Sequence, residues 1–203
     1  MSPGLFFHKL SFKPPFRQIK EAMRVARRAR NHEAWCRHHV KGFACQIDPS
    51  IEIRDDRPVT PENIFLGKGT VIERDCTLWL GKEPNSLIHL GERVYLGRNC
   101  FLGAIEPLEI GTDTLIGAYS YIITANHVSS DVNTPVRTQG YVSKPIRIGS
   151  DVWIGSHVVI LPGVTIGNKA IIGAGAIVTK SVGEREIWVG NPAKFTGKYR
   201  GER

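Results

Sequence analysis

A histidine near the middle of the chain stands where a proton-transfer group could work. His127 lies in the sequence ITANHV, at the start of a stretch of residues 124–147 that lacks the periodicity found on either side of it. Neutral imidazole accepts a proton near neutral pH, and a positioned base of this kind typically contributes about 10²- to 10⁴-fold to a transfer step. Long loops without periodicity are often functional. The alternative interpretation is that His127 is an ordinary surface residue.

The orientation of such a base depends on a partner for its second ring nitrogen. Asp131 in the same loop is one candidate, and a backbone carbonyl would serve as well. Trp153, in DVWIGS, should point outward by inside/outside alternation, where a bare tryptophan is unusual. It would form either the wall of a binding site or a contact between subunits.

Cysteine and metal chemistry are not indicated. The four cysteines form no CxxC pair, which argues against a zinc knuckle and a disulfide framework. Cys76 and Cys100 fall at repeat positions that should point inward, as small core residues. A cysteine nucleophile is therefore not expected.

A repeat of six residues predicts the elements that position these groups. Its aliphatic positions are Leu66, Ile72, Leu78, Leu90, Leu96, Leu102, Ile110, Ile116, Ile122, Ile148, Ile154, Ile160, Ile166, Ile172 and Val178. Glycine often follows the aliphatic residue, and a small or β-branched residue often stands four positions after it. Two smaller irregularities, at residues 83–89 and 106–109, are expected to be coil corners without chemistry.

A period of six excludes long amphipathic helices. The aliphatic residue and the small residue four later can face the same side of the chain, and glycine can adopt turn conformations that other residues avoid. Three such hexads would make an 18-residue triangular coil. Stacked coils would pair their backbones in parallel and bury an aliphatic column. The sequence therefore predicts an all-β protein, a parallel β-helix.

Residues 47–195 resemble the hexapeptide-repeat acyltransferase family, most specifically in residues 144–194, KPIRIGSDVWIGSHVVILPGVTIGNKAIIGAGAIVTKSVGEREIWVGNPAK. This block is similar to the branch that contains maltose, galactoside and xenobiotic acetyltransferases and polysaccharide O-acetyltransferases. The resemblance implies a left-handed β-helix of about five to six coils, although crossovers between parallel strands are normally right-handed. The loss of the repeat between Ile122 and Ile148 places an extended loop after the third clear coil.

The resemblance also implies the functional residues. His127 would be the general base for direct attack of an acceptor on the thioester of acetyl-CoA, the co-substrate, with no metal. Acceptor contacts would come from Asn99, Tyr119 and Trp153. The residues implied for acetyl-CoA are Trp153, Gly155, Ser156, Gly173, Ala174, Gly175, Thr179, Lys180, Asn191, Pro192 and Lys194. The family assembles as homotrimers with active sites between neighbouring subunits.

The acceptor implied is a sugar hydroxyl in surface polysaccharide biosynthesis, with the amine of a nucleotide-linked amino sugar as the alternative. A rival class is the carbonic anhydrase of similar fold, which binds zinc through histidines, two of them five residues apart. The repeat holds only His89, His127 and His157, so no such pair is present. A non-catalytic trimeric scaffold is a further alternative, but it would need neither the His127 loop nor the NPAK motif.

The N-terminal segment, residues 1–46, differs in charge from the rest of the chain. Residues 1–45 hold ten Lys/Arg and two acids, so they account for the whole net charge of +8. A helix beginning after Pro14-Pro15 would either cap the open end of the β-helix or attach to an anionic membrane surface. This uneven charge argues against a nucleic-acid partner.

The division expected along the chain is therefore residues 1–46, then the β-helix over residues 47–187, then a tail of residues 188–203 that closes the donor site. No stretch approaches a membrane span, and the first residues lack the apolar core of a signal peptide. A cytoplasmic location is expected, with contact at the inner face of the membrane as the alternative for the basic segment.

Overall fold

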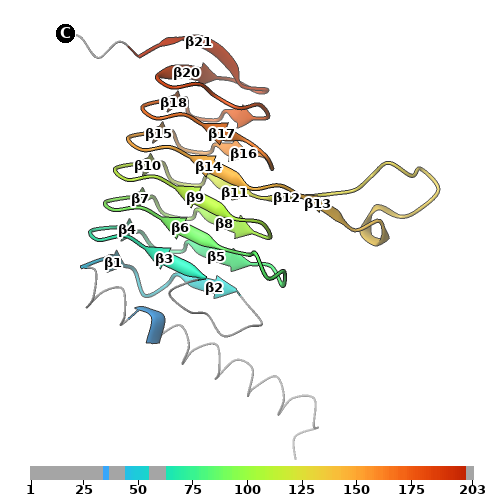
Figure 1. The fold of residues 1–203 in the computed structure, drawn as a ribbon, viewed down its shortest axis with the longest axis horizontal. Coiled ribbons are helices and arrows are strands. Elements are labelled where there is room, and N and C mark those ends of the chain that lie inside the picture. Colours follow the sequence, from blue (N-terminus) through green and yellow to red (C-terminus); the bar gives the residue numbers. More distant parts are fainter. Residues whose placement is uncertain (1–33, 37–43, 55–62, 200–203) are drawn as a thin grey trace, which may run out of the picture.

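The computed structural model describes residues 34–36, 44–54 and 63–199, which form a triangular prism of parallel strands with one projecting arm (Figure 1). Successive short strands run along three faces in turn, and each strand pairs with the strand of the next coil. The predicted parallel β-helix is confirmed. Its left-handed sense and its number of coils stay predictions from the resemblance.

The strands of each face share one sheet. The first face comprises β1 (Gln46–Ile47), β4 (Val71–Ile72), β7 (Tyr95–Leu96), β10 (Leu115–Ile116), β15 (Trp153–Ile154), β18 (Ile171–Ile172), β20 (Glu186–Val189) and the antiparallel β21 (Lys194–Lys198). The second face comprises β2 (Glu52–Arg54), β5 (Thr77–Leu80), β8 (Phe101–Ala104), β11 (Tyr121–Ile123), β16 (Val159–Ile160) and β19 (Ile177–Val178). The third face comprises β3 (Ile64–Leu66), β6 (Ile88–Leu90), β9 (Leu108–Ile110), β14 (Ile146–Ile148) and β17 (Thr165–Ile166).

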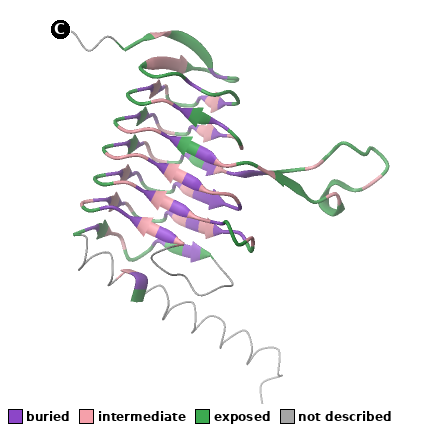
Figure 2. Cartoon of the chain, in the orientation of Figure 1, coloured by how far each residue is buried: buried purple, intermediate pink, exposed green. Residues whose placement is uncertain are grey.

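The interior of the prism is the aliphatic column that the repeat predicts. All fifteen aliphatic positions are buried, none more than 3% exposed (Figure 2). The small residues four positions later are buried as well. Several donate a hydrogen bond to the next coil, as the Cys76 thiol does to the Gly97 carbonyl at 3.1 Å and the Cys100 thiol does to the Gly117 carbonyl at 3.3 Å. The inward orientation expected for both cysteines is confirmed.

The reason expected for the repeated glycines is wrong. The glycine that follows each aliphatic residue is not in the left-handed region; that region is occupied two positions later, as at Asn99 (φ 57°) and Tyr119 (φ 64°). Glycine is needed instead because successive coils approach closely at the corners. A Cβ on Gly117 would lie 2.5 Å from the backbone nitrogen of Ser156 in the coil above.

The arm leaves the prism between β11 and β14 and contains a short hairpin of its own. Strands β12 (Ala125–His127) and β13 (Tyr141–Ser143) pair antiparallel, and a single 3₁₀ turn, η1 (Val136–Thr138), lies beyond them. The arm leaves the coils where the repeat loses its phase, but residues 124–147 are not a structureless loop, and strand β14 begins at Ile146. Figure 1 shows the arm extending well clear of the coils.

Most of the basic N-terminal segment, including the predicted helix after Pro15, lies outside the described residues. Residues 34–36 are described and helical. Trp35 in this piece is buried, and its indole nitrogen donates to the Ile64 carbonyl at 2.8 Å. This contact packs the piece against the lowest coil.

Candidate functional site

The base of the arm forms one wall of an apolar pocket. His127 and Tyr141 are directly opposite each other in the β12–β13 hairpin and both line the pocket. The pocket has a volume of about 340 Å³. Its lining residues are Trp79, Ile105, Tyr121, Ile123, Ala125, Asn126, His127, Tyr141 and Leu161.

The ring of His127 is oriented by the backbone of the opposite strand. Its Nδ1 lies 3.3 Å from the carbonyl oxygen of Gly140. A carbonyl oxygen only accepts, so this contact requires the proton on Nδ1 and leaves the lone pair on Nε2. Asp131, the other candidate partner, accepts instead from the Asn133 N–H and the Thr134 hydroxyl, which lower the pKa of its carboxyl. Of the two partners considered, the geometry matches the backbone carbonyl.

The arm is rooted in the coils by Thr124. This residue is fully buried, and its hydroxyl oxygen accepts from the backbone N–H groups of Ile105 at 2.8 Å and Glu106 at 3.1 Å. Its carbonyl accepts from the Lys144 N–H at 2.9 Å, which closes the base of the hairpin. The position of the arm relative to the prism is therefore fixed at its root.

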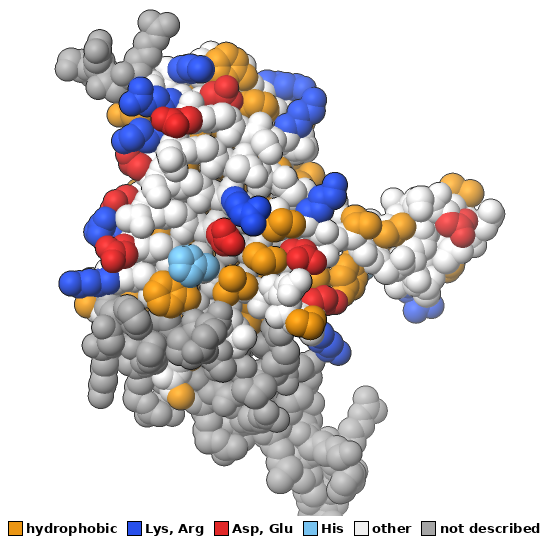
Figure 3. Space-filling view, in the orientation of Figure 1, with side chains coloured by type: hydrophobic (Ala, Val, Ile, Leu, Met, Phe, Trp, Pro, Cys, Tyr) orange, Lys and Arg blue, Asp and Glu red, His pale blue; other side chains and the backbone are white. Residues whose placement is uncertain are grey.

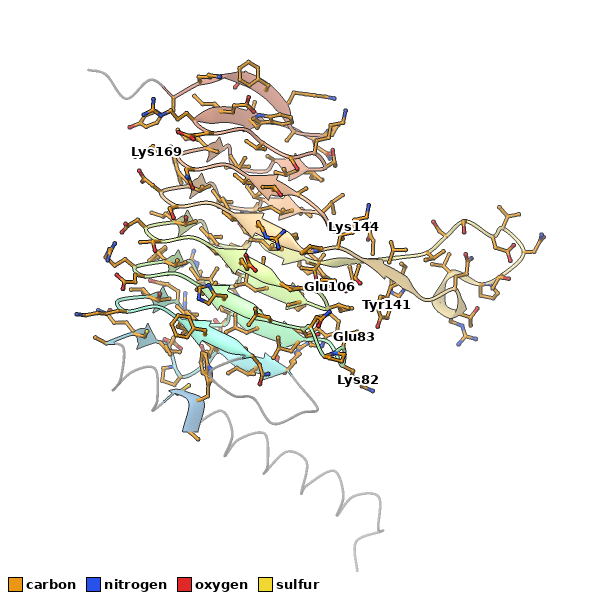
Figure 4. All side chains as sticks on the ribbon, in the orientation of Figure 1. Lys82, Glu83, Glu106, Tyr141, Lys144 and Lys169 are labelled. Carbon is orange, nitrogen blue, oxygen red and sulfur yellow. The ribbon has the colours of Figure 1, made fainter. Side chains whose placement is uncertain are left out.

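Two acidic residues expected to have no chemistry contact the arm. The Tyr141 hydroxyl donates to Glu83, and the Ser143 hydroxyl donates to Glu106 at 3.4 Å. Figure 4 shows Glu83, Glu106, Tyr141 and Lys144 gathered where the arm meets the coils. The signal in the sequence was the irregular spacing at residues 83–89 and 106–109, which was expected to mark only coil corners.

An aromatic row on the second face was also missed. Phe101 and Tyr121 occupy equivalent outward positions on strands β8 and β11, whereas Trp79 on β5 stands two residues further along its strand, opposite Gly103. Phe101 and Tyr121 stack at 4.7 Å between ring centroids, and Trp79 lies 6.4 Å from Phe101. Two of these rings, those of Trp79 and Tyr121, line the pocket beside His127.

Most of the residues that the resemblance assigns to ligand binding lie on another edge of the prism. Asn99, Tyr119, Gly155, Ser156, Gly173, Ala174 and Gly175 follow first-face strands and form a column on the edge between the first and second faces, here called the first corner. His127 lies on the edge between the second and third faces, the second corner. The width of the second face separates the two within one chain, so Asn99 and Tyr119 do not join the pocket.

The remaining assigned residues are divided between the faces. Trp153 points outward from the first face with 55% of its side chain exposed, as predicted. Thr179 and Lys180 follow β19 and are exposed on the second corner, above the arm. The turn of Asn191, Pro192 and Lys194 packs over the top coil, where the Ala193 N–H donates to the Ile177 carbonyl at 2.8 Å.

The other two histidines of the repeat are surface residues on different edges or faces. His157 stacks on Tyr119 at 5.0 Å on the first corner, and the Arg98 guanidinium lies 5.8 Å from the Tyr119 ring. His89 stacks on Phe65 at 4.8 Å in the middle of β6 on the third face. Figure 3 shows basic and acidic side chains interspersed over the face in view.

The described ranges contain neither a metal cluster nor a membrane-spanning helix. Among residues 34–36, 44–54 and 63–199, no group of three or more His, Cys, Asp and Glu side chains is placed to hold a metal ion. In that same part of the chain, no helix has the length and apolar character that crossing a membrane requires.

The chain is similar to known proteins in both sequence and fold. Residues 145–180 match the family model described as bacterial transferase hexapeptide (six repeats). A probable acetyltransferase of Mycobacterium tuberculosis, Rv3034c, is 33% identical over 150 residues, which cover 67% of this chain and 50% of that protein. A putative acetyltransferase of Staphylococcus aureus, SAV2555, is 41% identical over 112 residues, or 55% of each chain. The chain thus spans about half the length of these curated relatives.

Three solved structures share the fold. A mutant form of AntD, an N-acyltransferase from Bacillus cereus, has a TM-score of 0.64 and 19% identity, with 79% of this chain and 86% of that chain covered. A hexapeptide-repeat acetyltransferase of Vibrio cholerae, VCA0836, has a TM-score of 0.55 and 24% identity, with 92% of each covered. A maltose O-acetyltransferase of Clostridium difficile has a TM-score of 0.51 and 22% identity, with 88% and 89% covered. These structures show that the chain shares their fold, and residues 145–180 carry the hexapeptide signature of bacterial transferases.

Proposed function

We propose that the protein is an acetyl-CoA-dependent acetyltransferase that acts on a sugar hydroxyl, with His127 as its general base. The observation that carries this proposal is the Nδ1 contact with Gly140, which leaves the Nε2 lone pair of an exposed imidazole available beside the pocket. The names of the acetyltransferase relatives support the class of reaction.

The reaction balances with His127 as the proton carrier. Nε2 takes the proton of the acceptor hydroxyl as its oxygen attacks the thioester carbonyl, and a C–O bond forms. The C–S bond then breaks, and the thiolate of CoA leaves with the proton that His127 held. The products are the acetyl ester and free CoA, so the imidazole returns to its starting state.

The first corner supplies a surface on which acetyl-CoA would fit. Ala174 and Gly175 are exposed and carry almost no side chain, and a Cβ on Gly175 would meet nothing within 4 Å. Gly173, which precedes them, packs against the Val189 side chain, 2.6 Å from where its Cβ would lie. The narrow pantetheine chain of CoA could lie along this surface, here called the donor strip, beside the exposed side chain of Trp153. Lys180 is on the second corner, so its point charge would reach a CoA phosphate only from the neighbouring copy of the chain.

We further propose that the active site forms between subunits of a homotrimer. The strip and His127 are on different corners of one chain, so a site that contains both requires the first corner of one copy against the second corner of its neighbour. Cyclic symmetry would repeat this contact three times.

The pocket supports an acceptor of the size of one sugar ring. Its volume of about 340 Å³ lies at the small end of ligand pockets, and its rings offer an apolar surface for the C–H face of a sugar. A nucleotide-linked amino sugar is the alternative acceptor. The AntD structure was solved with dTDP-4-amino-4,6-dideoxyglucose and coenzyme A, so this class belongs in the test panel.

The experiment is calorimetric titration of acetyl-CoA followed by an acceptor panel of sugars and sugar nucleotides, with thiol release as the readout. We expect micromolar binding in the wild type and in His127→Ala, because the donor strip is on the first corner. Thiol release with a sugar acceptor should occur in the wild type and in the control, but should be largely lost in His127→Ala. The matched control is His89→Ala, which removes a surface histidine from the third face. Absence of acetyl-CoA binding in all three proteins would contradict the proposal and favour a scaffold, or a zinc protein if metal analysis found stoichiometric zinc.

A further inference from the structure

Three irregularities of the repeat fall on the same edge of the prism. Between Ile148 and Ile166 a coil takes eighteen residues, but it takes twenty-four between Leu66 and Leu90 and twenty between Leu90 and Ile110. The extra residues lie between β5 and β6 and between β8 and β9, both on the second corner. The next coil carries the arm at the same corner. The two smaller insertions therefore lie directly beneath the arm.

Each smaller insertion supplies a carboxylate to the arm. Glu83 accepts from the Tyr141 hydroxyl, and Glu106 accepts from the Ser143 hydroxyl at 3.4 Å. Tyr141 and Ser143 are alternate residues of β13, so they share one side of that strand. Tyr141 is also the residue directly opposite His127.

We propose that Glu83 and Tyr141 are positioning residues that clasp the arm onto the second corner and thereby fix the imidazole of His127 over the pocket. This inference rests on the proposed function for its catalytic consequence. The clasp itself is a property of the fold that can be measured without any substrate.

The arm needs such a contact because it is weakly supported elsewhere. Its strands are three residues long, η1 contains no buried residue, and Val132 is 95% exposed. A two-stranded hairpin of this size is marginal in water on its own. Thr124 fixes the root of β12, whereas the Tyr141–Glu83 contact joins the far strand, at the residue opposite His127, to an insertion two coils away.

The clasp is chemically suited to neutral pH. The hydrogen bond to Glu83, with burial and the negative charge of that residue, raises the pKa of the Tyr141 phenol, so its hydroxyl remains a donor. The imidazole contact then depends on the same strand, because Gly140, whose carbonyl meets Nδ1, directly precedes Tyr141. A displacement of β13 would move both the pocket wall and the group that orients His127.

The first test compares variants by steady-state kinetics. Tyr141→Phe and Glu83→Ala should each lower kcat about tenfold, the change expected when one hydrogen bond to a charged group is lost. The KM for acetyl-CoA should stay unchanged, because the donor strip is on the first corner. Glu83→Gln should retain more activity, since its amide oxygen still accepts, and the double variant should be no worse than either single one.

The matched control is Tyr95→Phe, which removes another tyrosine hydroxyl that interacts with a carboxylate, Glu73, on the first face. It should leave both kcat and hydrogen exchange of the arm unchanged. The second measurement is hydrogen exchange of residues 125–143, which should become faster in Tyr141→Phe and Glu83→Ala but not in the control.

Each outcome has a separate meaning. Unchanged exchange of the arm in Tyr141→Phe would overturn the clasp, whatever the activity. Faster exchange with an unchanged kcat would overturn its positioning role. If the kcat–pH profile of Tyr141→Phe lost its alkaline limb, and Glu83→Gln did not retain more activity than Glu83→Ala, Tyr141 would have a direct proton-transfer role. That result would overturn the positioning role. Full activity of His127→Ala would contradict the proposed function, while the exchange data would still decide whether the clasp exists.

Discussion

At the scale of single residues, the short distance between successive coils at the corners restricts the residue after each aliphatic position most strongly, and glycine fits there best. The regular period of the sequence shows where glycine occurs. It does not show that glycine is needed because two coils approach closely there. The cause depends on the separation of two coils that are far apart in sequence, and no local pattern reports that separation. The left-handed positions two residues later are occupied by Asn99, Tyr119 and His157, among others.

Gly117→Ala should destabilise the protein for this reason. The new Cβ would lie 2.5 Å from the Ser156 backbone nitrogen, and the clash with backbone should cost about 1–3 kcal/mol. Chemical denaturation checks this value. The matched control is Gly197→Ala, where a Cβ would meet nothing within 4 Å and stability should barely change. Equal stability of both variants would contradict the close-approach explanation.

At the scale of elements, the regular strands were predictable and the departures from regularity were not. Positions such as Ile154 and Ile172 are in register because the coil between them takes the regular eighteen residues. The arm's strands are three residues long and carry no alternation that separates them from a loop. Glu83 and Glu106 could have been noticed only by counting residues per coil, since that count places their insertions on the corner of His127.

The Tyr141–Glu83 contact should make the arm sensitive to alkaline pH. Because the folded-state pKa of Tyr141 is raised, the stabilisation is fully present below the ordinary phenol pKa and is lost as pH rises through the raised value. Hydrogen exchange of residues 125–143 should therefore accelerate at high pH more than exchange in the coils does, after correction for the intrinsic rate. Tyrosine absorbance titration of Glu83→Gln should show one phenol with a lower pKa than in the wild type. A titration identical to that of the wild type would contradict the assignment.

At the scale of the whole molecule, the repeat predicted the prism, but the sequence alone did not assign each site residue to a corner of it. The family resemblance implied which residues bind ligands but not the corner on which each one lies. Asn99 and Ala174 follow strands of the first face, whereas His127 follows a strand of the second face. The basic N-terminal segment lies mostly outside the described residues. The buried contact of Trp35 with the lowest coil favours the cap for the piece that is described.

The two-corner arrangement predicts complementation between inactive subunits. Ala174→Trp would block the strip on the first corner and His127→Ala would remove the base, so each variant alone should be inactive. Trimers refolded from an equal mixture should recover about a quarter of the wild-type activity, because that share of interfaces joins an intact strip to an intact base. Sedimentation should show a trimer for every protein. No recovery in mixed trimers would contradict a site shared between subunits.

The proposed reaction depends above all on His127 as the base of acetyl transfer, so the decisive experiment is the kcat of His127→Ala with the acceptor found in the panel. We predict a fall of about 10²- to 10⁴-fold with acetyl-CoA binding unchanged. A kcat within about threefold of the wild-type value would refute this role, since a positioned base contributes at least about a hundredfold.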